Sequence, residues 1–220
     1  MQHYDDRFKD APWYEKSSKE TVLLVGAGGI GGNALYCLAK TIPATYYVID
    51  HDIVSAANVG CQFFNRNQVG QYKVGALQDT LNQQSSAVIN PLTRRYSSET
   101  TNITIVAVDN MATRKQVFEA WKRVEGREIL IEGRLRANYY EIYVVTPGKE
   151  EEYEKTLFDD SEVDEGPCTF KQTAYFGMLI GARITQVLVN YLTNKYSADP
   201  VCVVPFKITE MGEPFLIEVV

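Results

Sequence analysis

A glycine-rich turn near the N-terminus constrains the fold of this chain more than any other feature. The turn, Gly26-Ala-Gly28-Gly29-Ile-Gly31, follows an apolar run at 21–25 that has the β-branched residues of a buried strand. A segment with helical character follows it. Glycines allow a tight turn and let backbone N–H groups approach a phosphate, and the start of a helix adds partial positive charge. This order of elements predicts a nucleotide-binding unit.

Strands and helices alternate along the first 130 residues, which predicts a single α/β domain over residues 1–220. We expect a Rossmann-like, mixed and mainly parallel sheet with helices on both faces and a C-terminal β-hairpin. The segment 149–166 is strongly acidic and predicts a mobile surface loop, within a crossover connection at about 149–170. The predicted strands are 21–25, 45–49, 87–89 (stopped by Asn90-Pro91), 103–108, 129–131 and 140–146, the predicted helices are 30–40, 73–84, 113–124 and 172–194, and the hairpin strands are 203–209 and 215–219.

Composition narrows the classes of partner and location. The net charge is −6, and no basic stripe indicates a nucleic-acid partner. The longest apolar stretch is too short to span a bilayer, and the polar N-terminus has no secretory signal, so we expect a cytoplasmic protein without a membrane anchor. The cysteines form no Cys-x-x-Cys pair and the chain has two histidines, so we expect no zinc. The four cysteines are Cys37, Cys61, Cys168 and Cys202.

A carboxylate ends the second predicted strand. Asp50 is placed to accept hydrogen bonds from the hydroxyl groups of a ribose. This combination of glycine turn and acidic residue fits proteins that use NAD, FAD or ATP, and a glycine turn without any ligand is the structural alternative. The remaining motifs are needed to choose among these ligands.

Several further motifs follow in a fixed order over residues 20–220. Each one is common by itself, but together they resemble the ThiF/MoeB/ubiquitin-activating superfamily, whose enzymes adenylate the C-terminus of a small carrier protein. The motifs are Asp50-His-Asp52 leading to Asn58 and Gln62, Val69-Gly70-Gln-Tyr-Lys73, Asn90-Pro91, Asp109-Asn110 with Arg114, Pro147-Gly148, Cys168-Thr169, and Gly177, Gly181 and Gln186 on the last helix.

The resemblance implies ATP and Mg²⁺ as ligands. Lys73 would contact phosphates, and Asp109 would hold Mg²⁺. Cys168 would accept a thioester or a persulfide. The other nucleotide contacts would come from Gly26, Gly28, Gly29 and Gly31, from Asp50 to the ribose, from Asp52 in the same loop, and from Asn58 and Gln62 to the nucleotide or its phosphates.

Each of these roles has a structural alternative. Lys73 could lie on a solvated helix surface, Asp109 could cap a helix, and Asn58 could stabilise a turn. Asp52 could likewise have a purely structural place in its loop, and Cys168 could be a small side chain at the base of the crossover loop.

One position departs from the superfamily pattern. The motif has an arginine immediately before Gln62, and this chain has Cys61. The change removes a cation from the phosphate site. Arg66, a few residues further on, or Arg7, in a segment that reaches the partner's site in homodimeric relatives, is a candidate replacement.

The function that the resemblance implies is ATP-dependent adenylation of the C-terminal carboxylate of a ubiquitin-like or sulfur-carrier protein, by a homodimer. The acidic crossover loop would suit a carrier with a basic surface. Two alternatives stay open. The first is a non-catalytic nucleotide-binding partner protein, which Cys61 favours. The second is an NAD-dependent oxidoreductase, which explains the glycine turn and Asp50 but gives Lys73, Asn58 and Asp109 no role.

Overall fold

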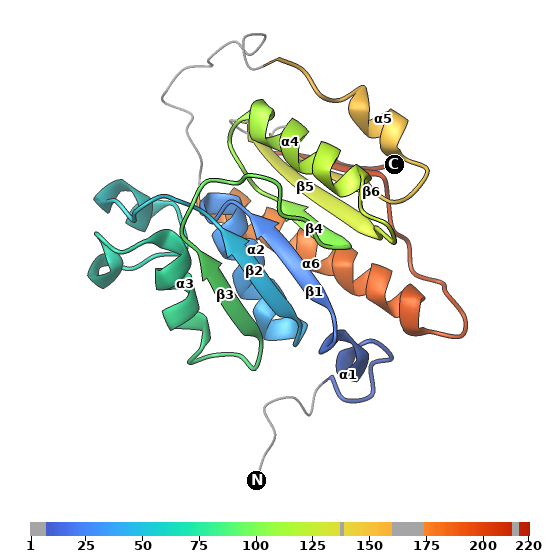
Figure 1. Ribbon diagram of the computed structural model, residues 1–220, viewed down its shortest axis with the longest axis horizontal. Coiled ribbons are helices and arrows are strands. Elements are labelled where there is room, and N and C mark those ends of the chain that lie inside the picture. The colour runs from blue at the N-terminus through green and yellow to red at the C-terminus, as the bar shows by residue number, and fades with distance from the viewer. Residues whose placement is uncertain (1–7, 137–138, 160–173, 213–215) are drawn as a thin grey trace.

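The fold is built on one continuous β-sheet. The structure is a computed structural model that describes residues 8–136, 139–159, 174–212 and 216–220. Eight strands pair in the order β3-β2-β1-β4-β5-β6-β7-β8 (Figure 1). Their bounds are β1 Thr21–Val25, β2 Thr45–Ile49, β3 Val88–Leu92, β4 Ile103–Val106, β5 Ile129–Arg136, β6 Tyr139–Val145, β7 Lys207–Met211 and β8 Leu216–Val219.

The direction of strand pairing changes at β5. Strands β3, β2, β1, β4 and β5 pair in parallel, and β6, β7 and β8 continue the sheet in antiparallel pairs. The β7–β8 pair is the predicted C-terminal hairpin. The predicted fold class, a Rossmann-like mixed sheet with mainly parallel pairing, is confirmed.

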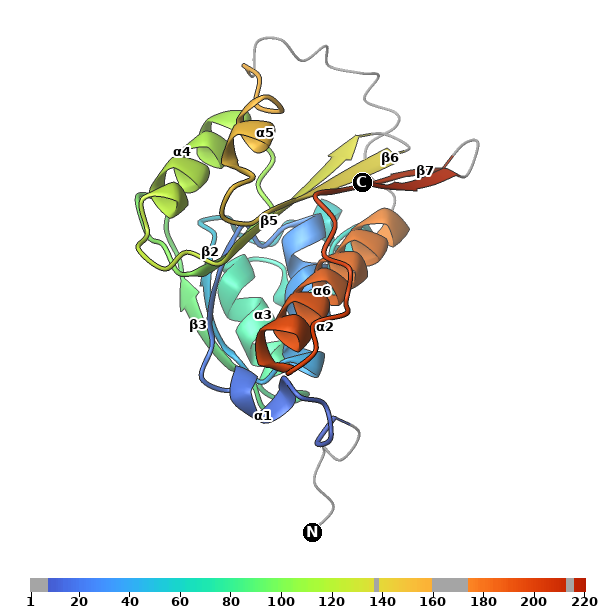
Figure 2. The same ribbon diagram turned by 90° about the vertical axis from the view of Figure 1, so that its right-hand side faces the viewer.

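Helices cover both faces of the sheet (Figure 2). Helices α2, α3 and α6 pack with Val22 and Leu24 of β1 on one face, and α4 and α5 pack with Leu23 and Val25 on the other. Alternate side chains of a strand point to opposite faces, so β1 is buried on both sides. The helices are α1 Tyr14–Ser17, α2 Gly29–Thr41, α3 Lys73–Leu81, α4 Met111–Lys122, α5 Glu150–Glu154 and α6 Ala174–Tyr196, with short 3₁₀ helices η1 at Ala56–Gly60 and η2 at Arg66–Gln68.

Helix α6 crosses α2 at very short range. A Cβ atom on Gly177 would lie 2.7 Å from the carbonyl oxygen of Gly29, and one on Gly181 would lie 2.7 Å from the backbone nitrogen of Ala34. Only glycine allows the two backbones to approach this closely. The contact holds the first turn of α2, which follows the glycine turn, in a fixed position.

Several strands differ from their predicted bounds: β4, predicted over 103–108, ends at Val106, and β7, predicted over 203–209, spans Lys207–Met211. Strand β3 was predicted to stop at Asn90-Pro91, but it continues through Pro91 to Leu92. It is an edge strand, where a missing N–H group is tolerated. Strand β5 was predicted over 129–131 and extends to Arg136, because β6 pairs with it along that length.

The prediction of a surface loop over 149–166 is wrong for its first part, which forms α5. Tyr153 of this helix is fully buried, and it packs against Phe118 and Tyr143. The carboxylate of Glu150 accepts hydrogen bonds from Arg127 Nε at 3.0 Å and Nη2 at 2.7 Å. An aromatic anchor and an ion pair therefore fix the start of this acidic segment. Residues 160–173, Cys168 among them, lie outside the described residues.

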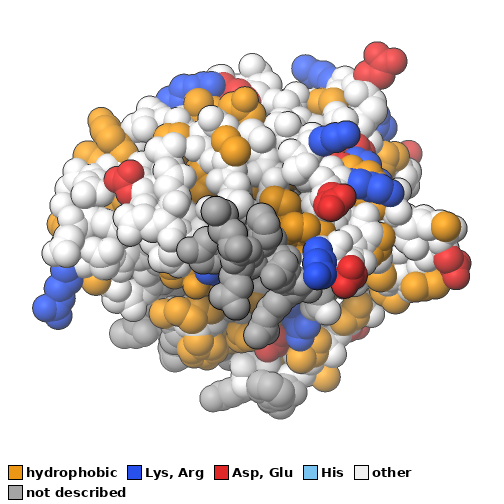
Figure 3. Space-filling model, turned by 90° about the horizontal axis from the view of Figure 1, so that it is seen from below, with side chains coloured by type: hydrophobic (Ala, Val, Ile, Leu, Met, Phe, Trp, Pro, Cys, Tyr) orange, Lys and Arg blue, Asp and Glu red, His pale blue; other side chains and the backbone are white. Residues whose placement is uncertain are grey.

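The described surface carries mixed charge. Basic and acidic side chains are interspersed on the face seen from below, without a separation of the two signs (Figure 3). A search of the described helices finds none with the length and apolar character needed to cross a bilayer.

Candidate functional site

The glycine turn holds the start of α2 against the ends of β1 and β4. Gly26 has a φ of 96°, in the left-handed region, and a Cβ there would lie 2.5 Å from the carbonyl oxygen of Ala107. A Cβ on Gly31 would lie 1.9 Å from the carbonyl oxygen of Gly26. Glycine is therefore required at both positions. The side of the turn at Gly28 is open, since the Gln62 amide, 4.0 Å away, is the nearest described group to a Cβ built there.

Asp50 ties the end of β2 to the glycine turn. One carboxylate oxygen accepts a hydrogen bond from the backbone N–H of Ala27 at 2.7 Å, and the other accepts one from Asp52 N–H at 2.7 Å. A carboxylate oxygen can accept two hydrogen bonds. Asp50 therefore positions the turn and keeps capacity for a ligand hydroxyl.

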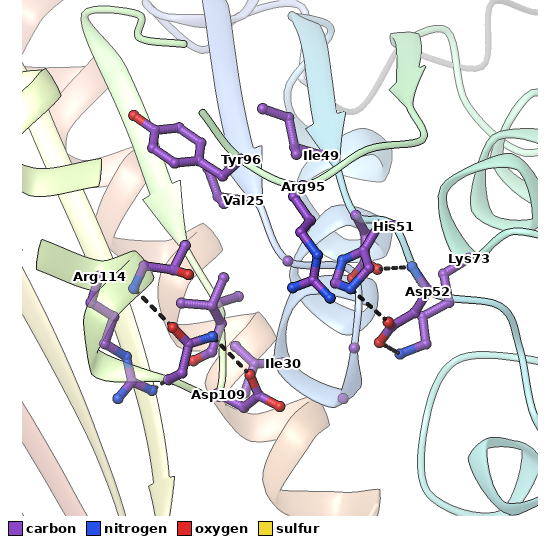
Figure 4. A pocket seen from close by; sticks show the side chains of 18 of the residues that line it. Val25, Ile30, Ile49, His51, Asp52, Lys73, Arg95, Tyr96, Asp109 and Arg114 are labelled. Carbon is purple, nitrogen blue, oxygen red and sulfur yellow. Dashed lines mark hydrogen bonds and ion pairs between the residues drawn. The ribbon is translucent and has the colours of Figure 1, made fainter. Parts of the chain in front are cut away.

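A pocket of about 640 Å³ opens beside this turn, at the carboxyl ends of β1, β2 and β4 (Figure 4). Its volume is in the range of sites that hold small ligands and cofactors. It lies where the strand order reverses between β1 and β4, the position at which open α/β sheets bind ligands. Of the predicted site residues, the lining contains Gly26, Gly28, Gly29, Asp50, Asp52, Gln62, Lys73 and Asp109, whereas Gly31 and Asn58 lie outside it.

Lys73 is buried and paired. Its Nζ lies 2.8 Å from Asp52 Oδ2, and the Lys73 side chain is 8% exposed, so it is not on a solvated helix surface. The hydrogen bond from Lys73 lowers the pKa of Asp52, against the effect of partial burial, and the charges of Lys73, His51 and Arg95 add to the lowering. The pair fixes a protonated amine at the wall of the pocket, with N–H donors left for a ligand.

Gln62 and Asn58 have different environments. Gln62 lines the pocket, and its Oε1 is buried with no hydrogen-bond partner in the described part of the chain. A buried acceptor of this kind calls for a donor from a ligand or a water. Asn58 Oδ1 accepts a hydrogen bond from the backbone N–H of Ser55 at 2.9 Å, as part of the cap of η1. Asn58 therefore stabilises a turn beside the pocket.

Asp109 lies in the pocket lining immediately before α4. The N-cap of α4 is Asn110, whose Oδ1 accepts a hydrogen bond from Thr113 N–H at 2.8 Å, so Asp109 is not the helix cap. Asn110 Nδ2 donates to Asp109 Oδ1 at 3.3 Å. The Asp109 carboxylate is exposed at the pocket, and carboxylate oxygens are the ligands that Mg²⁺ prefers.

Sequence reasoning missed three residues that follow β3. Arg94, Arg95 and Tyr96 line the pocket, directly after the carboxyl end of that strand. The signal that could have located them is the position of the end of β3, because residues that follow a parallel strand lie at the ligand-binding edge of the sheet. Because β3 was predicted to end before Asn90-Pro91, these side chains were not placed at the ligand-binding edge of the sheet. Arg66 does not line this pocket, and Arg7 lies outside the described residues.

A buried ion network supports the opposite wall of the pocket. Glu132 is fully buried and accepts two hydrogen bonds from Arg134, at 2.6 and 2.8 Å. Arg114 Nε lies 2.8 Å from the same carboxylate, without hydrogen-bond alignment. The Tyr153 hydroxyl donates to Glu132, and Arg134 Nη1 donates to the carbonyl oxygen of Thr156 at 2.9 Å. Two guanidinium groups therefore share one carboxylate, so the network carries net positive charge beside the pocket.

Comparison with known proteins identifies relatives of this chain. A model of the ThiF family matches residues 5–209. Ubiquitin-like modifier-activating enzyme 5 of Dictyostelium discoideum is 33% identical over 116 residues, which cover 53% of this chain and 28% of that protein. The enzyme of the same name from Caenorhabditis elegans is 33% identical over 100 residues, covering 46% of this chain and 22% of that protein. The matches thus span less than a third of these relatives.

Solved structures share the fold at low sequence identity. The crystal structure of PaaA aligns with a TM-score of 0.74 and 17% identity, over 99% of this chain and 72% of that one. Escherichia coli MccB, crystallised with AMPCPP and MccA, aligns with a TM-score of 0.71 and 17% identity, over 94% of this chain and 64% of that one. This likeness extends through the parallel and the antiparallel parts of the sheet.

Proposed function

Because this chain belongs to the ThiF family, we propose that it binds ATP in the pocket and adenylates the C-terminal carboxylate of a ubiquitin-like or sulfur-carrier protein. The observation that carries the proposal is the meeting of the glycine turn, Lys73 and Asp109 in one pocket at the ligand-binding edge of the sheet. The names of the relatives support it, because they include a ubiquitin-like modifier-activating enzyme and MccB bound to AMPCPP and MccA.

The proposed reaction makes a poor acyl donor reactive. A carboxylate oxygen of the carrier attacks the α-phosphorus of ATP, the bond from that phosphorus to the bridging oxygen breaks, and pyrophosphate leaves with the electron pair. The products are an acyl adenylate and pyrophosphate. Catalysis of such a step is mostly positioning and stabilisation of negative charge. The N–H groups of the glycine turn and the Lys73 ammonium, which Asp52 orients, would supply both.

The described side chains fit a nucleotide. Gln62 Oε1 is a buried acceptor without a protein partner, and a ribose hydroxyl is a suitable donor for it. Asp50 keeps acceptor capacity on the same side of the turn. The open side of Gly28 lets the backbone come close to a phosphate.

For Mg²⁺, Asp109 is a better ligand than the neighbouring acidic cluster. Oxygen and nitrogen atoms of Asp50, His51 and Asp52 lie within 4.8 Å of one another. However, Asp50 accepts two backbone N–H groups, and Asp52 is paired with Lys73. A carboxylate that already compensates an ammonium attracts a cation weakly. Asp109 has no such cationic partner within ion-pair distance in the described part of the chain. It would hold Mg²⁺, and the Mg²⁺ would neutralise charge on the triphosphate.

The assembly and location follow from the same proposal. We expect a homodimer in the cytoplasm, with no nucleic-acid partner. Three cysteines in the described residues, Cys37, Cys61 and Cys202, are free thiols, which suits a reducing compartment. The role of Cys168 as a thioester or persulfide acceptor stays a prediction.

Two alternatives remain. Cys61 favours the first, a nucleotide-binding partner protein without catalysis; the second is an NAD-dependent oxidoreductase.

The decisive assay measures pyrophosphate release from ATP·Mg with each small protein ending in Gly-Gly that the same genome encodes. Release by the wild type that is lost in Asp109→Asn but kept in Asp79→Asn, an exposed charge-matched control on α3, supports adenylation. ATP binding without release from any carrier favours the non-catalytic protein, and tighter binding of NADH than of ATP favours the oxidoreductase.

A further inference from the structure

The pocket lacks one cation of the motif that its sequence otherwise follows. Cys61 occupies the position before Gln62, and its Sγ donates to the carbonyl oxygen of Ala57 at 3.5 Å, outside the pocket lining. A nucleoside triphosphate carries several negative charges, so this loss matters for any protein that binds one here. Another side chain has to supply the charge if the pocket holds a triphosphate tightly.

Most basic groups of the pocket already have a carboxylate partner, although Arg114 and Arg134 share one. The described lining includes five lysine and arginine side chains, and four of them form an ion pair with a carboxylate. The pairs are Lys73 with Asp52, Arg94 with Glu99, Arg114 with Glu132, and Arg134 with Glu132. The fifth side chain is Arg95.

Arg95 has no hydrogen bond or ion pair to any described residue, and it is exposed. Its side chain extends into the pocket on the side where His51 and Asp52 lie (Figure 4). Its charge contributes to lowering the pKa of Asp52, after the larger effects of Lys73 and His51. The free guanidinium therefore lies near the Lys73–Asp52 pair.

The segment that carries Arg95 is held together by contacts on both sides of it. Before it, Arg94 pairs with Glu99 and donates to Ser97 Oγ at 3.4 Å. After it, the Tyr96 hydroxyl donates to the carbonyl oxygen of Glu99 at 3.0 Å. These contacts join residues within 94–99, so they restrain the conformation of this segment and leave the guanidinium available, which reduces the entropy lost when it binds an anion.

We propose that Arg95 is a second phosphate-binding cation of this pocket, beside Lys73, and that it replaces, from the segment between β3 and β4, the arginine for which Cys61 stands. The ligand class is the phosphate chain of a nucleoside triphosphate, so this inference rests on the proposed function. A guanidinium presents several N–H donors in a plane and can bind a phosphate through two of them. Arg66, the candidate nearest in sequence, does not line the pocket.

The test measures binding of three probes: ATP and inorganic tripolyphosphate by calorimetry, and adenosine by ligand-observed NMR. Arg95→Ala should weaken ATP and tripolyphosphate by roughly tenfold or more, since a hydrogen-bonded charge contact is lost. Adenosine affinity should stay the same. Arg66→Ala removes the same charge outside the pocket and serves as the control, with no change expected for any probe.

Four results would overturn the assignment or separate it from the proposed function. Wild-type ATP affinity in Arg95→Ala overturns it and leaves the proposed function intact. An equal loss for adenosine and ATP places Arg95 against the base, and this also overturns it. If the wild type binds tripolyphosphate through Arg95 but binds ATP no more tightly than tripolyphosphate, the proposed function is contradicted and the assignment of Arg95 to phosphate binding stands. A wild type that binds none of the three probes overturns both.

Discussion

Replacing Glu132 with glutamine should strongly destabilise the protein, because it removes the negative charge shared by two buried guanidinium groups. Glu132 is 0% exposed, Arg134 is 4% exposed and Arg114 is 9% exposed. The two arginines lie 2.6 and 2.8 Å from the Glu132 carboxylate. Glutamine has nearly the same volume, so the substitution tests charge and hydrogen bonding without opening a cavity.

The expected cost is about 3 kcal/mol of unfolding free energy. Breaking a buried ion pair by removing one partner typically costs 3–5 kcal/mol, because the other charge stays buried without compensation. The lower end applies here. Arg134 keeps its hydrogen bond to the Thr156 carbonyl oxygen, and Arg114 Nη2 keeps one to the Val108 carbonyl oxygen at 2.7 Å. For a chain of this length, such a loss lowers Tm by roughly 6–12 °C.

The assay is urea unfolding followed by the fluorescence of the two tryptophans, Trp13 and Trp121, both of which are buried; Trp121 lies in the same layer as Tyr153. Glu119→Gln is the matched control, because Glu119 pairs with Lys122 on the surface of α4 and is 47% exposed. That pair should contribute less than about 1 kcal/mol. A Glu132→Gln loss as small as the control loss would refute the reasoning, since the network would then carry no buried, uncompensated charge.

Two further predictions concern backbone contact and pH. Gly181→Ala should cost about 1–3 kcal/mol, because its Cβ would lie 2.7 Å from Ala34 N, whereas Gly75→Ala on α3, which has open space around the Cβ position, should stabilise by about 0.5–1 kcal/mol. Equal effects of the two substitutions in chemical denaturation would contradict the close α2–α6 contact. Because Lys73 lowers the pKa of Asp52, the stabilisation by their pair is complete above the usual aspartate pKa and is lost as pH falls through the lowered value. The difference in unfolding free energy between wild type and Asp52→Asn should therefore shrink below about pH 4, and a constant difference down to pH 2 would argue against the pair.

The sequence was sufficient to predict the sheet class and eight of the residues that line the pocket. The apolar run before Gly26 predicted a buried strand, and Asp50 marked the end of β2. Both signals depend on residues close together in the sequence, so the order of elements could be predicted from them. Eight predicted positions line the pocket because they follow strands whose carboxyl ends meet at one edge. Long-range pairing was harder to predict. Pro91 is tolerated because β3 is an edge strand, and β5 is long because β6 pairs with it. Both facts depend on strand neighbours that are distant in the chain.

The parts of the site that the sequence could not reveal depend on three-dimensional charge balance. Glu132 and Arg134 look like ordinary polar residues of a strand, and their burial appears only when Tyr153 covers them. Likewise, nothing in the sequence separates Arg94, which is paired, from Arg95, which is not. Asn58 matched a motif, yet its side chain caps a turn.

The most direct test of the central claim is calorimetric titration of the wild type, Lys73→Ala and Lys40→Ala with ATP·Mg and with NADH. Lys40 is exposed on α2, and its Nζ donates to the carbonyl oxygen of Gln84 at 3.0 Å, so Lys40→Ala is a control for loss of a lysine away from the pocket. We predict that ATP·Mg binds, that NADH does not, and that Lys73→Ala weakens ATP·Mg by roughly tenfold or more while Lys40→Ala does not. Preference for NADH, or unchanged ATP·Mg affinity in a folded Lys73→Ala variant, would contradict the account.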